Sequence, residues 1–214
     1  PLFLIEAPFL ITTVISSEMV KYASNAFLAT KISFINDIAH LCEKVGADVH
    51  DVARGMGLDH RIGRLFLHPG PGYGGSCFPK DTLAILKVAR EEGLDLKVIR
   101  AAVEVNDSQA ERMVAKIRGL LGAASGKKVG ILGLSFKPNT DDIRESASIR
   151  IIEMLVAEGA AIRAYDPVAM PEALKVLKGV EMGTDPYDTA AGCDALVIAT
   201  EWNQFRNLDL PRLK

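Results

Sequence analysis

A run of about 28 residues without glycine or proline, from Glu18 to Val45, constrains the fold of this 214-residue chain more than any other feature. Apolar residues recur along it at helical spacing, among them Phe27 and Ile38. One helix of that length would measure about 42 Å at 1.5 Å per residue, which exceeds the usual helix of a small domain. Such a helix often forms a spine between domains or a subunit interface, so we expect a homodimer through Glu18–Val45.

Signals for the ends of elements surround this run. Residues 1–15 are apolar and β-branched, which predicts a strand or an extended lead-in. Ser16 and Ser17, followed by an acid, predict the start of the long helix, and Gly46 predicts its end. Asp48 is a candidate N-cap. The helices expected after the long one cover residues 49–54, 82–92 and 96–121.

The pattern changes after the small, flexible segment 122–126. Strands and helices alternate from there, which predicts a parallel α/β sheet, and the last strand reads as a buried type. Their expected ranges are 128–134, 148–158, 160–165, 170–178, 186–191 and 194–200. We therefore expect an α/β protein with an all-helical domain in residues 1–122 and a parallel-sheet domain in residues 127–214.

Two glycines after the first expected strand, Gly130 and Gly133, are a weak dinucleotide-binding signal, because Phe136 stands where the third glycine of the fingerprint would fall. Asp166 ends the second strand, where that motif places a ribose ligand. Open α/β sheets bind ligands beyond the carboxyl ends of their strands. We therefore expect Phe136, Asp166 and residues 200–202 to surround a nucleotide-sized crevice. The alternative for Asp166 is a plain strand-ending turn.

The stretch from His68 to Asp81 holds the strongest chemical signal, because four glycines and two prolines in it precede Cys77. Glycine permits positive φ and a close approach of the backbone to a ligand. Pro79 suits the first turn of a helix. Cys77 is therefore expected at a loop-to-helix junction, near free backbone N–H groups and a positive helix dipole, which favours the thiolate. The alternative is a small core hydrophobe under a tight loop, and the local sequence leaves both open.

Composition excludes several classes of function. The three cysteines, Cys42, Cys77 and Cys193, are widely spaced and odd in number, which argues against a disulfide framework and for a reducing compartment, the cytoplasm. A net charge of −2 gives no general attraction to nucleic acid or to an anionic membrane. No apolar run approaches the roughly 20 residues of a membrane span. No Cys/His cluster has zinc spacing, so we expect no metal site.

Three segments together, residues 17–29, 70–81 and 130–146, closely resemble the UDP-glucose/GDP-mannose dehydrogenase family. The resemblance covers essentially the whole chain and favours the UDP-glucose 6-dehydrogenases. Their UDP-N-acetyl-mannosamine relatives typically place His before the cysteine and lack the Phe-Pro-Lys-Asp tail, whereas this chain has Ser76 and Phe78–Asp81. Such enzymes have an N-terminal Rossmann domain for NAD, a central helical domain and a Rossmann-like UDP-sugar domain. The chain matches the second and most of the third, so we expect a fragment.

The resemblance implies a reaction and roles for residues. Family enzymes oxidise C6 of UDP-glucose to the carboxylate of UDP-glucuronate with two NAD and one water. By resemblance, Cys77 captures the intermediate aldehyde as a thiohemiacetal and then becomes a thioester that water hydrolyses. Lys21 and Asn25, four residues apart and so on one helical face, match the donors that stabilise the oxyanions. Asp81 matches the residue that manages water and protons.

Binding residues are carried over in the same way. Those matched to the UDP-sugar, besides Lys21 and Asn25, are Arg61, His68, Gly70, Gly72, Tyr73, Gly74, Phe136 and Lys137. Those matched to NAD are Cys77, Lys80 and Arg144. Arg61 matches an arginine that reaches the neighbouring subunit's site, which agrees with a dimer. His68 departs from the lysine that is common in the family.

Two alternatives to a dehydrogenase remain. The chain by itself can be a module that dimerises and holds UDP-sugar without turnover, since the NAD domain is not among its segments, and we expect this of the isolated chain. A thiol hydrolase would pair Cys77 with a histidine. The candidates are His40, His50, His60 and His68, and none of them sits in a pairing motif.

Overall fold

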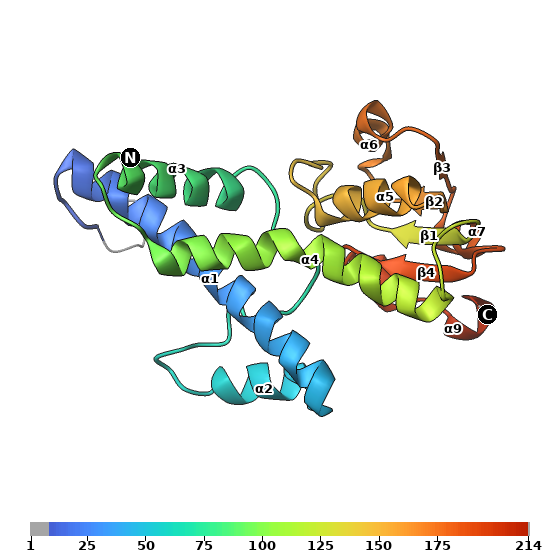
Figure 1. Cartoon of the computed structure of the whole chain (residues 1–214), viewed down its shortest axis with the longest axis horizontal. Coiled ribbons are helices and arrows are strands. Elements are labelled where there is room, and N and C mark those ends of the chain that lie inside the picture. The colour runs from blue at the N-terminus through green and yellow to red at the C-terminus, as the bar shows by residue number, and fades with distance from the viewer. Residues whose placement is uncertain (1–8, 214) are drawn as a thin grey trace.

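The computed structural model describes residues 9–213 and contains a helical part and an α/β part (Figure 1). The helical part is built on α1, Val14–Val45, whose 32 residues confirm the expected long spine. The other helices of this part are α2, Val49–Met56, α3, Phe78–Glu91, and α4, Lys97–Leu121. In Figure 1, α1 and α4 cross, α3 lies beside the first half of α1, and α2 lies below the second half. The expected fold class is therefore confirmed.

The ends of α1 show where local signals were sufficient and where they were not. Gly46 ends the helix as predicted, in the left-handed conformation (φ 77°), and its N–H reaches the carbonyl of Cys42. The start was predicted too late. Thr13 is the N-cap and accepts a hydrogen bond from Ser16 N at 3.2 Å, so Val14 and Ile15 are helical. Residues 9–13 form neither helix nor strand, with Thr13 extended, and residues 1–8 lie outside the described range.

The second half of α4 joins the helical part to the sheet. In the first half of α4, the carbonyl of Ala102 accepts a hydrogen bond from Ser33 of α1 at 2.6 Å. Further along, Ala110, Val114 and Ile117 belong to the hydrophobic core of the α/β part. Because one rigid helix packs in both places, it fixes the two parts relative to each other. The two predicted domains therefore share α4.

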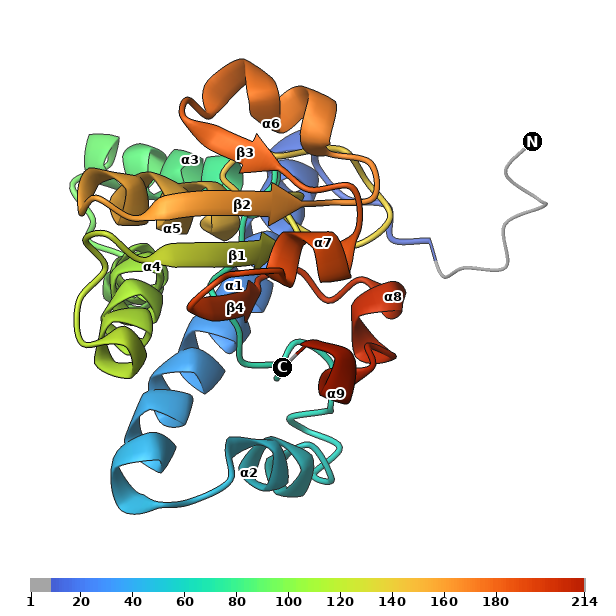
Figure 2. The same ribbon diagram turned by 90° about the vertical axis from the view of Figure 1, so that its right-hand side faces the viewer.

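Within the described residues, four parallel strands form the sheet, in the order β3-β2-β1-β4 (Figure 2). In register, Val129 lies opposite Ile162 on one side and Ala195 on the other. The bounds are Lys128–Leu132 for β1, Ala161–Tyr165 for β2, Val180–Met182 for β3 and Ala195–Ile198 for β4. The helices of this part are α5, Ala147–Ala157, α6, Met170–Val176, α7, Pro186–Ala190, α8, Asn203–Arg206, and α9, Leu210–Leu213.

Two strands differ from the prediction. The expected buried strand at 194–200 is β4, which stands at an edge of the described sheet and is only partly buried. An apolar run cannot distinguish a central strand from an edge strand that one packed face makes apolar. Strand β3 has three residues and was not predicted, because so short a segment carries no alternation.

The expected role of Asp166 as a ribose ligand is wrong. Its carboxylate is buried and accepts hydrogen bonds from the loops that follow β1 and β2, and from the indole of Trp202 at 3.1 Å. The backbone donors are Leu134 N, Ser135 N, Val168 N and Ala169 N, at 2.7–3.1 Å. Thr200 in turn donates to the carbonyl of Ser135 at 2.7 Å. These side chains tie the carboxyl ends of the strands together, and no acceptor of Asp166 is left for a ribose.

Candidate active site

Cys77 occupies the loop-to-helix junction that the sequence predicts. It is the N-cap of α3, it is exposed, and Pro79 lies in the first turn. Its carbonyl accepts the first helical hydrogen bond, from Asp81 N at 2.9 Å. The thiol sulfur lies 3.8 Å from the hydroxyl of Ser76. The exposure of Cys77 contradicts the core-hydrophobe alternative, and as N-cap it stands at the positive end of the α3 helix dipole.

One turn further along α3, Asp81 gathers three donors from two helices. Its side chain has 0% exposure. Lys21 Nζ donates to it at 2.6 Å and Asn25 Nδ2 at 2.5 Å, and Lys80 makes a third, shorter contact. Lys21 and Asn25 therefore do share a face of α1, as predicted. Their partner in this structure is the carboxylate of Asp81, one helical turn after Cys77.

The three donors decide the charge of Asp81. Burial alone would raise the pKa of this carboxyl, but hydrogen bonds from Lys21, Lys80 and Asn25 outweigh it and lower the pKa to about 2. Asp81 is therefore ionised at neutral pH and is a weak proton acceptor. In this arrangement it anchors the ammonium of Lys21, which is itself 59% exposed and so can be reached by a ligand.

The glycine loop before Cys77 is docked on the α/β part. Gly75 N donates to the carbonyl of Arg144 at 2.8 Å. A Cβ at Gly74 would lie 2.2 Å from the carbonyl oxygen of Glu145, and one at Gly75 would lie 2.6 Å from the ring of Phe136. Only glycine fits such contacts, and Gly75 also has φ of 79°. The loop thus brings Cys77 next to the segment 136–145.

Tyr73 of the loop is buried rather than free. Its ring packs edge-on against Phe78 with the centroids 5.9 Å apart. Burial raises the pKa of its phenol to about 12, so it remains a neutral hydroxyl. Asn36 and Asn106, which no sequence pattern predicted as site residues, hydrogen bond to the backbone of this loop. No local pattern marks them, because their partners are more than thirty residues away.

The other predicted residues lie on both sides of the loop. Phe136 is half-buried, with the ammonium of Lys137 located 5.3 Å from its ring centroid. Arg144 is exposed and forms a two-pronged pair with Asp142. His68 is exposed.

Arg61 stands apart, in the loop that follows α2, where it pairs with Asp59. In Figures 1 and 2 that region lies at the opposite end of the helical part from α3.

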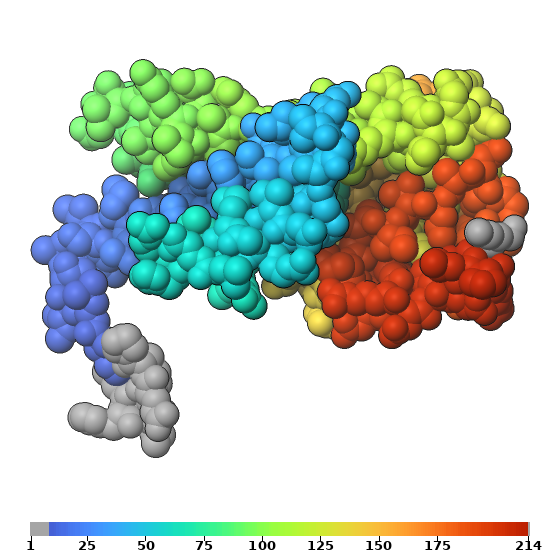
Figure 3. Space-filling model, turned by 90° about the horizontal axis from the view of Figure 1, so that it is seen from below, coloured from blue at the N-terminus to red at the C-terminus, as the bar shows by residue number. Residues whose placement is uncertain are grey.

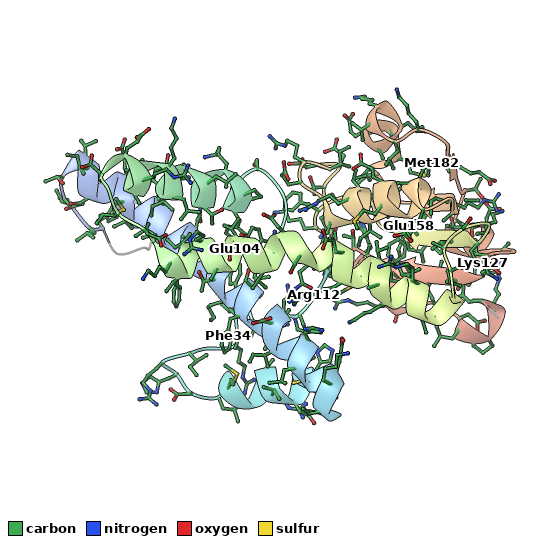
Figure 4. All side chains as sticks on the ribbon, in the orientation of Figure 1. Phe34, Glu104, Arg112, Lys127, Glu158 and Met182 are labelled. Atoms are coloured by element: carbon green, nitrogen blue, oxygen red, sulfur yellow. The ribbon has the colours of Figure 1, made fainter. Side chains whose placement is uncertain are left out.

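Two cavities flank the loop. One, of about 330 Å³, is bordered by Gly70, by Asn36 of α1, by Arg112 of α4 and by the end of β4. In Figure 3 a recess separates α1 and α2, in blue and cyan, from the α/β part, in red. Figure 4 shows Arg112 between α4 and α1, where it pairs with Asp37 at 3.6 Å. The other cavity, of about 440 Å³, is bordered by Ser76, Lys80 and Arg144. Both have the size of small-ligand sites.

Two absences among residues 9–213 bear on the class of site. No group of three or more His, Cys, Asp and Glu side chains there could hold a metal ion. No helix within this range combines the length and the apolar character that crossing a membrane requires. Cys77 has no hydrogen bond to any histidine of the described chain.

Sequence comparison finds one family along most of the chain. Residues 15–108 match the central domain of the UDP-glucose/GDP-mannose dehydrogenase family, and residues 130–214 match its UDP binding domain. A UDP-glucose 6-dehydrogenase of Rhizobium meliloti is 54% identical over 100% of this chain and 49% of its own length. The UDP-glucose 6-dehydrogenase TuaD of Bacillus subtilis is 50% identical over 97% of this chain and 45% of its own length.

Solved structures agree. A UDP-glucose dehydrogenase from Pyrobaculum islandicum superposes with a TM-score of 0.93 at 42% identity, over 95% of this chain and 48% of the other. A UDP-D-ManNAc dehydrogenase from Pyrococcus horikoshii reaches a TM-score of 0.83 at 26% identity, over 98% of this chain and 47% of the other. The chain spans about half the length of the curated relatives it matches.

Proposed function

The chain belongs to the UDP-glucose/GDP-mannose dehydrogenase family, and we propose that it carries the substrate-binding and covalent-capture residues of a UDP-glucose 6-dehydrogenase. The reaction converts UDP-glucose and water to UDP-glucuronate with the loss of two hydrides from C6. When bound, NAD accepts these hydrides. The observation that carries the proposal is an exposed Cys77 at the start of α3, one turn from a carboxylate that holds Lys21 and Asn25 in place.

Cys77 forms a covalent bond to the substrate carbon after the first oxidation and releases it at the end. After the alcohol has lost a hydride and a proton, the thiolate of Cys77 adds to the aldehyde carbon and forms a thiohemiacetal. Loss of the second hydride leaves a thioester. Water then adds to the thioester carbon, the thiolate leaves, and the carboxylate remains. Covalent capture divides a hard reaction into easier steps and keeps the aldehyde from escaping.

Lys21 and Asn25 are the proposed donors to the oxyanions of these steps. Asp81 holds both by its carboxylate. Because the pKa of Asp81 is about 2, we assign it an anchoring role rather than that of a general base, and its effect on water would act through the Lys21 ammonium.

Binding of the two nucleotides is assigned to opposite sides of the glycine loop. For UDP-glucose the proposed contacts are Arg61, His68, Gly70, Gly72, Tyr73, Gly74, Phe136 and Lys137. Gly70 borders the first cavity, which supports this assignment, whereas Tyr73 borders the second. For NAD they are Cys77, Lys80 and Arg144. The second cavity fits such a ligand in chemistry, because two exposed cations at its border can hold phosphates.

We further propose a homodimer through the long helix. Along α1, several large apolar side chains remain open to solvent, including Phe27, Phe34 and Leu41. A patch of this kind marks an interface. The exposed Arg61 is then available to the neighbouring subunit's site. The three cysteines are free, which fits a reducing compartment such as the cytoplasm.

Alkylation of the chain by iodoacetamide, followed by mass spectrometry, tests the site. UDP-glucose should slow the alkylation of Cys77 severalfold. In Cys77→Ser, the alkylated product that UDP-glucose suppresses should be absent. UDP-N-acetyl-mannosamine serves as the matched control ligand and should protect less. If a saturating concentration of UDP-glucose left the labelling rate unchanged, the assignment of the sugar site would be wrong.

The main alternative is a binding module, and we expect it to describe these 214 residues assayed alone. They contain no complete three-glycine dinucleotide fingerprint, so hydride acceptance should be absent. Calorimetry should then detect UDP-glucose binding while absorbance detects no NADH. Robust NADH formation by this chain would overturn that expectation. A thiol hydrolase is less favoured, since no histidine among residues 9–213 hydrogen bonds to Cys77.

A further inference from the structure

Asn36, in the middle of α1, reaches across to the backbone of the glycine loop. Its side chain is 3% exposed, and its Oδ1 accepts a hydrogen bond from Gly70 N at 2.8 Å. The backbone N–H can only donate, so the oxygen of the carboxamide must face the loop. The Nδ2 group of Asn36 has no hydrogen-bond partner among the described residues. Only the acceptor of this side chain is therefore used.

Asn106, on α4, holds the same loop three residues further along and uses both of its polar groups. Its Oδ1 accepts from Tyr73 N at 2.8 Å, and its Nδ2 donates to Tyr73 O at 3.2 Å. Between the two clamps, Gly72 has φ of 114°, and a Cβ there would lie 2.9 Å from Asn106 Oδ1. Asn106 thus requires glycine at position 72, since a side chain would push it off the loop.

We propose that Asn36 and Asn106 are positioning residues that shape the loop for the nucleotide sugar. They fix residues 70 and 73 from two crossing helices, and Arg144 fixes residue 75 from the α/β part. Gly70 and Pro71 border one cavity, Tyr73 and Gly75 border the other, and the loop leads directly into Cys77. The inference rests on the proposed function for the identity of the ligand, but the contacts themselves are independent of it.

Calorimetric titration of UDP into the chain distinguishes the two clamps. Asn36→Leu and Asn106→Leu should each weaken UDP binding roughly tenfold, because a free loop must be ordered on binding. Asn36→Asp keeps the acceptor for Gly70 N, and Arg112 and Lys116, each already paired with an acid, border the same cavity, so UDP affinity should stay within roughly threefold of wild type. Asn106→Asp places a carboxylate against the carbonyl of Tyr73 and should be no better than leucine.

Ser33→Ala is the matched control for stability. Ser33 also links α1 to α4, through a hydrogen bond to the carbonyl of Ala102 that does not involve the loop. It should lower the melting temperature and leave UDP affinity unchanged. Asparagine variants that melted earlier and still bound UDP like wild type would show a structural role only and overturn the proposal.

Amide hydrogen exchange provides a readout that needs no ligand. Exchange at Gly70 should accelerate in Asn36→Leu, and exchange at Tyr73 in Asn106→Leu, each at least tenfold, with α1 and α4 unchanged. If wild type failed to bind UDP, the proposed function would fail, and accelerated exchange would still support the positioning role. Unchanged exchange at both amides would contradict it whatever UDP does.

Discussion

Two buried aspartates, one in each part of the molecule, have lowered pKa values for different reasons. Asp166 joins the carboxyl ends of the strands, and backbone N–H groups overcome the effect of burial on its pKa. Asp81 lies at the start of α3, and its donors are mainly the side chains of Lys21, Lys80 and Asn25. The fixed backbone donors around Asp166 stabilise the fold, whereas the long, half-exposed side chains of Lys21 and Lys80 can leave Asp81 and bind a ligand.

The comparison predicts its largest effect at Asp166. Asp166→Ala should lower the free energy of unfolding by about 3–5 kcal/mol, because it leaves several buried donors unpaired. Urea denaturation followed by circular dichroism measures it. Asp185→Ala is the control: Asp185 also accepts backbone N–H groups, as the exposed N-cap of α7, and its loss should be clearly smaller. Equal losses at the two sites would refute the architectural role of Asp166.

Asp81→Asn should have a smaller effect on stability and a chemical effect that Asp166 variants lack. The stability loss should be about 1–2 kcal/mol, because water can solvate the released lysines. Freed from the carboxylate, the ammonium of Lys80 should attract the thiolate of Cys77, and iodoacetamide labelling should accelerate severalfold.

Lys80→Gln is the matched variant for that experiment and should slow labelling of Cys77. It removes the cation and keeps Asp81 paired to Lys21 and Asn25. Labelling rates that stayed the same in both variants would mean that the Asp81 cluster has no electrostatic effect on Cys77. Asp81 would then differ from Asp166 in its donors but not in function.

Local signals predicted the elements that this comparison needs, and long-range contacts decided what each aspartate does. The uninterrupted run to Val45, the Asp48 cap and the Pro79 junction each depend on a few neighbouring residues, so they could be predicted. Asp166 was predicted to face a ribose because its position at a strand end is all that the sequence contains. Its real donors come from segments as far as 36 residues away.

The same reason explains the two asparagines that the sequence did not reveal. Asn36 lies 34 residues from Gly70, and Asn106 lies 33 residues from Tyr73. Side chain to backbone contacts across such distances follow from the crossing of α1 and α4, which no local pattern encodes. Lys21 and Asn25, on the first half of α1, were singled out by the family resemblance, and their spacing predicted only that they share a helical face. Their pairing with Asp81 depends on how α3 packs against α1.

The smallest expected effect is on the pH dependence of stability in acid. Comparing wild type with Asp81→Asn separates the contribution of Asp81 from that of Asp166. The pKa of Asp81 is about 2 in the folded chain and about 3.8 without its partners, so the stability that it contributes is complete above pH 4 and is lost as the pH falls toward 2. Because both lysines are more than half exposed and screened, this contribution should amount to about 1 kcal/mol. Stability measured by urea denaturation between pH 5 and pH 2.5 should therefore fall less steeply in Asp81→Asn than in wild type. The remaining slope should include Asp166, whose pKa is also lowered and whose contribution disappears in the same direction. Identical slopes for wild type and Asp81→Asn would mean that the lysines do not hold the carboxylate in solution, and Asp81 would then be free to act as a proton acceptor.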